Sequence, residues 1–135
     1  MSYTGKCLCQ AVQVIAEKPN LKLGACHCNM CRKWTGGPFF AVDCGASVVF
    51  DGEEHIAVFD SSQWAERGFC QICGTHLFYR LKQQQQYMLS AGLFEAIKNF
   101  EFDHQVFIDE KPDYYTFSNQ THDMTGAEIF AKYEA

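Results

Sequence analysis

Long apolar runs are missing from this chain of 135 residues. No stretch approaches the roughly eighteen consecutive apolar residues that a membrane-spanning helix needs. The N-terminal residues Met1 to Lys6 also lack the apolar core of a secretory signal peptide. We therefore expect a cytoplasmic protein with no membrane partner.

Positive charge is scarce as well. Eleven Lys and Arg residues stand against sixteen Asp and Glu residues, which gives a formal charge of −5, and no long basic run occurs. Surfaces that bind nucleic acids are typically basic, so we expect no nucleic-acid partner. The apolar share of 47% is ordinary for a globular protein. The length is close to that of one compact domain, and we expect a single domain over residues 1–135. The oligomeric state does not follow from these features.

Aromatic residues are abundant, with twelve Phe and six Tyr, and this composition favours β-structure over a helical bundle. Apolar segments separated by turn residues predict strands at 10–15, 21–26, 39–43, 47–50, 55–59, 76–81, 87–91 and 104–108. Gln83 to Gln86 would form a hairpin tip, and Arg32 to Pro38 an irregular loop because of Thr35-Gly36-Gly37-Pro38. The one predicted helix is 126–133, with Thr125 as its cap and Glu128 three positions later. The expected fold is an antiparallel β domain with short helical pieces.

Seven of the eight Cys residues fall into three groups. These groups are Cys7 and Cys9; Cys26, Cys28 and Cys31; and Cys70 and Cys73. Cys residues separated by one residue are too close for an unstrained disulfide, and the absence of a secretion signal points to a reducing compartment. Short Cys spacings of this kind are typical of metal ligands. A disulfide framework formed between the groups is the alternative.

The groups can be combined into metal sites in two ways. A structural zinc takes four protein ligands, whereas a catalytic zinc takes three and keeps one position open. Joining the first and third groups completes a four-cysteine site and leaves Cys26, Cys28 and Cys31 as a three-cysteine site. Joining the third group to two members of the middle group uses fewer of the thiols, so we favour the first arrangement.

The middle group has three candidates for a fourth ligand. His27 lies between two ligands, so an extended backbone would point its side chain away from the sulfurs. Cys44 follows thirteen residues after Cys31, and we expect a partly buried thiol there. His76 would pack beside the four-cysteine site.

The residues that follow the middle group form the sequence Arg32-Lys33-Trp34-Thr35-Gly36-Gly37. The two bases would either stabilise the negative charge of three thiolates and an incoming anion, or form a solvated pair. Trp34 would either flank a pocket or belong to the core.

Three motifs and two later segments are similar to those of a known family. In chain order they are Gly5-x-Cys7-x-Cys9, Cys26-His27-Cys28-x-x-Cys31-Arg32-Lys33-x-Thr35-Gly36-Gly37-Pro38-Phe39, Phe69-Cys70-x-x-Cys73-Gly74-Thr75-x-Leu77-Phe78, Ala91-Gly92-Leu93, and His104-Gln105-Val106-Phe107-Ile108-x-x-Lys111-Pro112. Over residues 5–115 the chain resembles the glutathione-dependent formaldehyde-activating enzyme and centromere protein V family. Gln10 departs from the family, which often has Gly after the first Cys pair; this bears on the local turn and not on the ligands.

The resemblance implies a mainly β, Mss4-like fold of antiparallel sheets with zinc-ribbon-like knuckles, here with a short C-terminal helix. It implies a structural zinc on Cys7, Cys9, Cys70 and Cys73, and a catalytic zinc on Cys26, Cys28 and Cys31. Glutathione would then meet Arg32, Lys33, Thr35, Gly36 and Gly37.

The function that the resemblance implies is a zinc-dependent carbon–sulfur lyase that joins or splits glutathione and formaldehyde. One alternative is a zinc lyase or binding protein for another small thiol or aldehyde. The other is a zinc-stabilised interaction domain without activity, which would require a fourth protein ligand on the middle site.

Overall fold

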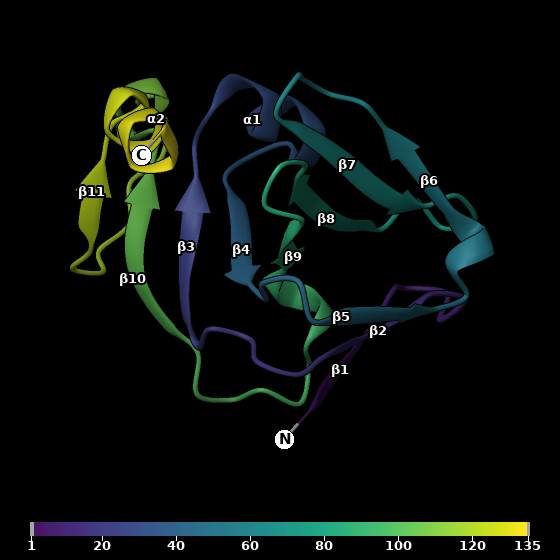
Figure 1. The fold of residues 1–135 in the computed structure, drawn as a ribbon. Helices are drawn as coiled ribbons and strands as arrows, with labels where there is room; N and C mark the ends of the chain where they lie inside the picture. The colour runs from purple at the N-terminus through teal and green to yellow at the C-terminus, as the bar shows by residue number, and fades with distance from the viewer. Residues whose placement is uncertain (1, 135) are drawn as a thin grey trace. The chain divides into compact units, whose positions relative to one another are not determined.

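A computed structural model describes residues 2–134 and shows a mainly β protein with a short C-terminal helix (Figure 1), which confirms the predicted fold class. The chain forms two compact units. The first unit contains the residues up to Leu21 together with Val42–Asn99. The second unit contains Lys22–Ala41 together with the residues from Phe100 onward. The prediction of one domain over residues 1–135 stays a prediction.

The first unit contains a three-stranded antiparallel sheet with the order β1-β2-β5. Its strands are β1 (Tyr3–Lys6), β2 (Gln13–Ala16) and β5 (Val48–Asp51). Strand β2 buries Val14 and Ala16, while Ile15 between them is 37% exposed. Successive side chains of a strand point to opposite faces, so one face of this sheet contributes to the core and the other meets solvent.

A four-stranded antiparallel meander in the order β9-β8-β7-β6 completes the first unit. The strands are β6 (Ile56–Phe59), β7 (Ala65–Cys70), β8 (His76–Leu81) and β9 (Gln86–Ser90); 3-10 turns lie at η1 (Glu53–His55) and η2 (Ala91–Leu93). A turn over residues 82–85 joins β8 to β9, which confirms the predicted hairpin tip except at Gln86, the first residue of β9. The first unit also contains an aromatic cluster of Phe50, Phe78 and Tyr87, with ring centroids 5.1–5.5 Å apart.

The second unit is built on strands in the order β11-β10-β3-β4. They are β3 (Lys22–Cys26), β10 (Glu101–Val106), β11 (His122–Met124) and β4 (Phe39–Asp43), which pairs with β3 through its first three residues. Strand β10 runs parallel to both of its neighbours, β3 and β11, whereas β3 and β4 are antiparallel (Figure 1). The predicted strand 104–108 is displaced, because Phe107 adopts a φ of 54° and is followed by the 3-10 turn η3 (Ile108–Glu110).

The predicted loop from Arg32 is wrong over its first residues, because helix α1 spans Asn29–Thr35. Cys28 caps its N-terminus, and Gly36 ends it with a φ of 85°, a conformation that glycine adopts without strain. The Thr-Gly-Gly-Pro sequence marks the end of a helix and not a loop through the whole segment.

The C-terminal helix α2 (Gly126–Glu134) begins as predicted. The Glu128 side chain accepts a hydrogen bond from the Thr125 backbone N–H, and the Thr125 hydroxyl accepts one from the Glu128 backbone N–H. This reciprocal pair is a capping box. Among residues 2–134, no helix is long and apolar enough to cross a membrane.

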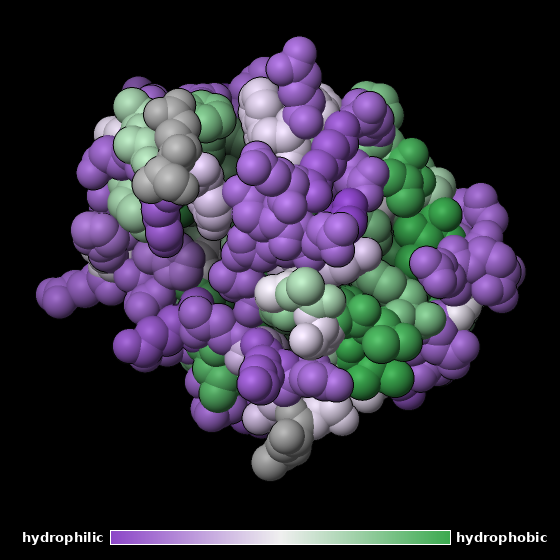
Figure 2. All heavy atoms as spheres, viewed as in Figure 1, coloured by the Kyte–Doolittle hydropathy of each residue, from purple (hydrophilic) through white to green (hydrophobic). Residues whose placement is uncertain are grey.

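The surface carries apolar side chains as well as polar ones. Figure 2 shows a green area over the part of the first unit where Figure 1 places β5 and β6. Val49, Val58 and Phe59 of these strands are 52–64% exposed.

Candidate metal centres

The first unit brings Cys7, Cys9, Cys70 and Cys73 together, although more than sixty residues separate the two pairs. Their four sulfurs lie within 4.8 Å of one another. The Sγ atom of Cys9 is 3.7 Å from that of Cys7 and 3.7 Å from that of Cys70. Thiolates at about 2.3 Å from a tetrahedral zinc are separated by about 3.8 Å, so the cluster has the dimensions of a four-cysteine metal site.

Each pair of this cluster lies on a tight turn. The Cys7 sulfur accepts a hydrogen bond of 3.4 Å from the Val12 backbone N–H, and the Cys73 sulfur lies 3.1 Å from the Thr75 hydroxyl. Gly74 has a φ of 79°, which glycine adopts without strain in the turn of a zinc knuckle. These donors stabilise negative charge on the sulfurs, which is the form in which cysteine binds a metal.

Gln10 takes part in the other turn at a backbone angle that usually belongs to glycine. Its φ is 67°, and its N–H donates to the Cys7 carbonyl oxygen over 3.0 Å. The family-like glycine would suit this position, because a side chain in the left-handed region is strained. Gln10→Gly is therefore expected to raise the free energy of unfolding by about 0.5–1 kcal/mol, as measured by chemical denaturation.

Gln13→Gly provides the matched control, because Gln13 lies in β2 with extended backbone. The same chemical change there should lower the free energy of unfolding by about 0.5–1 kcal/mol. Equal effects of the two substitutions would show that the angle at Gln10 stores no strain.

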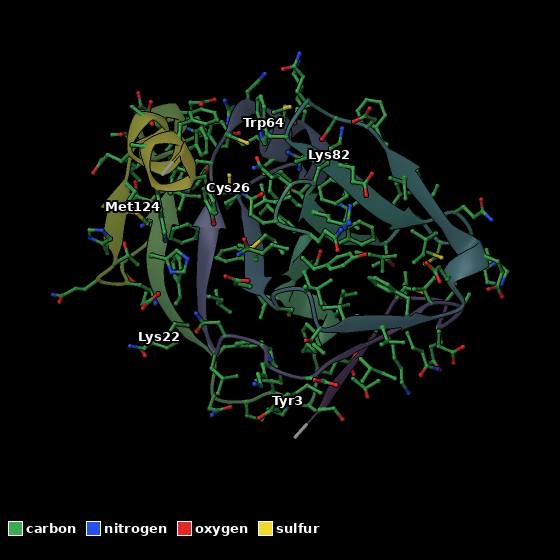
Figure 3. The ribbon with its side chains drawn as sticks, viewed as in Figure 1. Tyr3, Lys22, Cys26, Trp64, Lys82 and Met124 are labelled. Atoms are coloured by element: carbon green, nitrogen blue, oxygen red, sulfur yellow. The ribbon has the colours of Figure 1, made fainter. Side chains whose placement is uncertain are left out.

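The second unit brings together the other three sulfurs, those of Cys26, Cys28 and Cys31, which also lie within 4.8 Å of one another. Cys26 ends β3, as Figure 3 shows, and Cys31 lies in the first turn of α1. The Cys28 sulfur accepts a hydrogen bond of 3.3 Å from the Cys31 backbone N–H. The end of a strand and the start of a helix thus aim three sulfurs at one point.

Crowding of these sulfurs favours the binding of a cation. The pKa of Cys26 is raised above its ordinary value, first by hydrogen bonds with Cys28 and with Cys31, then by burial. Three thiols held this close, two of them buried, cannot all ionise without a compensating charge. A divalent metal ion supplies that charge, and the all-sulfur donor set suits zinc. Both clusters could therefore hold a metal.

Comparison with known proteins gives the family. The sequence profile of the family described as "Glutathione-dependent formaldehyde-activating enzyme" matches residues 2–110. The chain belongs to this family. A Schizosaccharomyces pombe relative named as an uncharacterized lyase is 41% identical over 128 residues, which cover 94% of this chain and 93% of that protein.

Two further relatives carry the name of the family. The Halomonas elongata protein is 29% identical over 87 residues, covering 58% of this chain and 55% of that protein. The Podospora anserina protein is 33% identical over 90 residues, covering 62% of this chain and 42% of that protein. A crystal structure of a Rhodobacter sphaeroides protein has a TM-score of 0.61 at 21% identity over 70% of this chain and 90% of that chain. This last likeness shows the fold.

Of the three candidates for a fourth ligand of the middle site, His27 belongs to the second unit, whereas Cys44 and His76 belong to the first. His27 is fully buried, and both of its ring nitrogens are engaged by other side chains. Cys44 is 1% exposed in the first unit, where burial raises the pKa of its thiol to about 12. His76 belongs to β8, also in the first unit. Within the described residues of the second unit, the cluster contains no fourth Cys, His, Asp or Glu.

His27 is held by a chain of hydrogen bonds whose direction can be assigned. Asp123 accepts from the Thr121 hydroxyl over 2.6 Å, so the Thr121 oxygen accepts from the Gln105 amide over 2.9 Å. The Gln105 carbonyl oxygen then faces His27 Nε2 at 2.7 Å, and Nε2 must carry the proton. Burial lowers the pKa of His27, so the ring is neutral and its Nδ1 accepts from the Tyr115 hydroxyl over 2.7 Å.

This chain of hydrogen bonds was not predicted. Its members are not spaced in the sequence as metal ligands are; they are Gln105, Tyr115, Thr121 and Asp123. The similarity of the segment around Gln105 to the family is the signal that could have pointed to it. Its physical role follows from the bonds: it fixes the side chain that lies between Cys26 and Cys28.

Removing the acceptor of His27 is expected to destabilise the second unit. Gln105 is 6% exposed, and Gln105→Leu would leave the Nε2–H of His27 buried without a partner. The expected loss is about 1–3 kcal/mol in the free energy of unfolding, measured by chemical denaturation. Gln83→Leu at the exposed hairpin tip is the control and should change stability little. A loss no larger than that of the control would contradict the assignment.

The residues after Cys31 divide into two groups. Lys33 is exposed, and Arg32 is partly exposed with its Nε donating to the His27 carbonyl oxygen over 2.9 Å. Thr35, Gly36 and Gly37 take part in hydrogen bonds within their own segment. The Gly36 N–H donates to the Arg32 carbonyl oxygen, and the Thr35 hydroxyl donates to the Cys31 carbonyl oxygen over 2.9 Å. Trp34 packs against Phe39 with centroids 5.5 Å apart.

Proposed function

We propose that this chain is a zinc-dependent carbon–sulfur lyase that joins and splits glutathione and formaldehyde. The observation that carries the proposal is the cluster of Cys26, Cys28 and Cys31, which offers three sulfur ligands and no fourth Cys, His, Asp or Glu from the described residues of its own unit. Catalytic zinc sites have this composition, whereas structural sites are closed by four ligands. The names of the family and of the S. pombe lyase support the same class of reaction.

The two clusters would have different tasks. We assign a structural zinc to Cys7, Cys9, Cys70 and Cys73, because its ligands join two distant parts of the first unit. Cys26, Cys28 and Cys31 would hold the catalytic zinc, which would supply Lewis-acid chemistry that lowers the pKa of a thiol toward neutrality.

The reaction itself is an addition. The glutathione sulfur gives an electron pair to the carbonyl carbon of formaldehyde, and a carbon–sulfur bond forms. The carbonyl π pair moves to the oxygen, which takes a proton and becomes the hydroxyl of S-(hydroxymethyl)glutathione. The reverse sequence splits the adduct.

The residues around the cluster would bind and orient the thiol. Arg32 and Lys33 add positive charge beside three thiolates and attract an anionic peptide. Thr35, Gly36 and Gly37, which we also place at the substrate side, keep the end of α1 in one conformation and so fix where these charges lie. His27 keeps the chain between Cys26 and Cys28 in place through its ring hydrogen bonds.

NMR exchange spectroscopy tests the proposal. The zinc-loaded protein is expected to accelerate exchange between formaldehyde and S-(hydroxymethyl)glutathione above the spontaneous rate. The same experiment with other small thiols distinguishes a lyase for a different substrate. Unchanged exchange at high protein concentration, together with x-ray absorption showing both metals fully ligated by Cys or His, would overturn the proposal in favour of a zinc-stabilised interaction domain.

A further inference from the structure

A cavity of about 510 Å³ lies in the second unit, outside the three-cysteine cluster. Pockets for small ligands have volumes of about 300–1,000 Å³. Side chains that line it and bear on its chemistry are Gln105, Lys111, Phe117, Asn119, Thr121 and Asp123. Lys111 supplies a positive charge and Asp123 a negative one, and the other side chains supply two primary amides and a hydroxyl. This composition suits a ligand that carries both a positive and a negative group.

The Lys111 ammonium group is held in place by neutral groups and forms no ion pair with a described carboxylate. Lys111 Nζ donates hydrogen bonds to the carbonyl oxygens of Pro112 and Tyr115, and it lies 5.1 Å from the centroid of the Tyr115 ring. An ammonium group has three N–H donors, so one remains for a ligand. No ion pair joins Lys111 to a carboxylate within residues 2–134.

The anion is fixed in a similar way. Asp123 accepts a hydrogen bond of 2.6 Å from the Thr121 hydroxyl, and the described part of the chain contains no cation paired with it. Lys111 and Asp123 thus line one cavity without forming an ion pair with each other. The positive and negative charges are both available to a ligand that lies between them.

Two further lining residues are held by contacts with their neighbours. Phe117 packs against Phe40 and Phe102, with centroids 5.5 and 5.0 Å apart. Gln105 is almost fully buried and hydrogen-bonded at both ends of its amide. A wall of this kind needs little reorganisation when a ligand binds, which favours affinity.

We propose that this cavity binds the α-amino-acid end of the thiol substrate, with Lys111 facing the carboxylate and Asp123 facing the ammonium group. The proposal rests on the proposed function, since the γ-glutamyl end of glutathione is such a group. Gln105 and Thr121 line the cavity and belong to the hydrogen-bond chain that reaches His27, between Cys26 and Cys28. A phosphate ligand fits less well, because the Asp123 carboxylate would repel it.

Binding of S-methylglutathione to the zinc-loaded protein tests this proposal, because its thioether cannot form a thiolate. Titration followed by ¹H–¹⁵N NMR is expected to shift the amides of residues 116–123. Asp123→Asn should weaken binding about tenfold, since it removes a charged partner while its side-chain oxygen still accepts from Thr121. Asp113→Asn is the matched control, because Asp113 is exposed in the same segment and does not line the cavity.

A second probe identifies which ligand group meets Asp123. The deaminated analogue of S-methylglutathione should bind the wild type about tenfold more weakly and should bind wild type and Asp123→Asn equally. Lys111→Met should weaken both probes alike. Equal affinity of wild type and Asp123→Asn for S-methylglutathione, or shifts confined to other residues, would overturn the proposal.

The result also separates this proposal from the proposed function. Binding in the cavity without acceleration of formaldehyde exchange would refute the lyase and leave the amino-acid site standing. Accelerated exchange with a KM for glutathione unaffected by Asp123→Asn would refute the amino-acid site and leave the lyase standing.

Discussion

Cys70→Ala is expected to lose the zinc of the four-cysteine site and most of its folded population at 37 °C. Cys70 is fully buried, and its sulfur lies 3.7 Å from that of Cys9. A structural zinc contributes about 10–16 kcal/mol of binding free energy in small zinc domains, whereas a whole domain is stable by only about 5–15 kcal/mol. Zinc analysis of the purified protein and thermal unfolding by circular dichroism measure the two losses.

The control for this variant is Cys44→Ala. Cys44 is also buried in the first unit, but its sulfur belongs to neither cluster. This variant should keep both metals and lose only about 1 kcal/mol of stability. If the two variants unfold at the same temperature, the four-cysteine cluster does not hold a structural metal.

Cys28→Ser is expected to abolish the acceleration of formaldehyde exchange while the protein stays folded. Cys28 caps α1 through its sulfur, and a serine hydroxyl can accept the same hydrogen bond from the Cys31 N–H. The substitution removes one of three thiolates, so we expect the catalytic zinc to be lost. Metal catalysis of this type contributes several kcal/mol, and the exchange rate should fall about a thousandfold.

Zinc content and thermal unfolding accompany this rate measurement. One zinc per chain should remain in Cys28→Ser, bound at the four-cysteine site, and the far-ultraviolet spectrum should match that of the wild type. Cys44→Ala should retain the exchange rate. Unfolding of Cys28→Ser to the extent expected for Cys70→Ala would show that both metals are structural and would contradict the division of tasks.

Much of the fold could be predicted from local features. The hairpin between β8 and β9 and the capping box of Thr125 and Glu128 both depend on neighbouring residues, and both are confirmed, although Gln86 belongs to β9 and not to the turn. Helix α1 was missed because Thr35-Gly36-Gly37-Pro38 is typical of loops. The capping sulfur of Cys28 is an uncommon N-cap, and it gave no signal of a helix.

Long-range pairing lay beyond what the sequence pattern shows. Strand β10 is parallel to β3 and β11, yet alternation along a strand is the same in parallel and antiparallel sheets. The predicted end of β10 lies two residues too late, because Phe107 adopts a left-handed backbone angle. The neighbouring residues give no sign of this angle in the sequence.

The sequence by itself determined the grouping of the candidate metal ligands, which the structure brings together in the same two clusters. Cys residues separated by one or two residues can reach one ion from a single turn, so their spacing alone predicts the three groups. A structural zinc takes four ligands, so joining the two pairs leaves the group of three. Only the tertiary structure decided what surrounds that group. In the folded protein, the His27 ring is hydrogen-bonded and supports the segment between Cys26 and Cys28. Thr35, Gly36 and Gly37 lie at the end of helix α1. It also placed Lys111 and Asp123 on the walls of one cavity. Such contacts join residues far apart in the chain, and they depend on packing that no short stretch of sequence encodes.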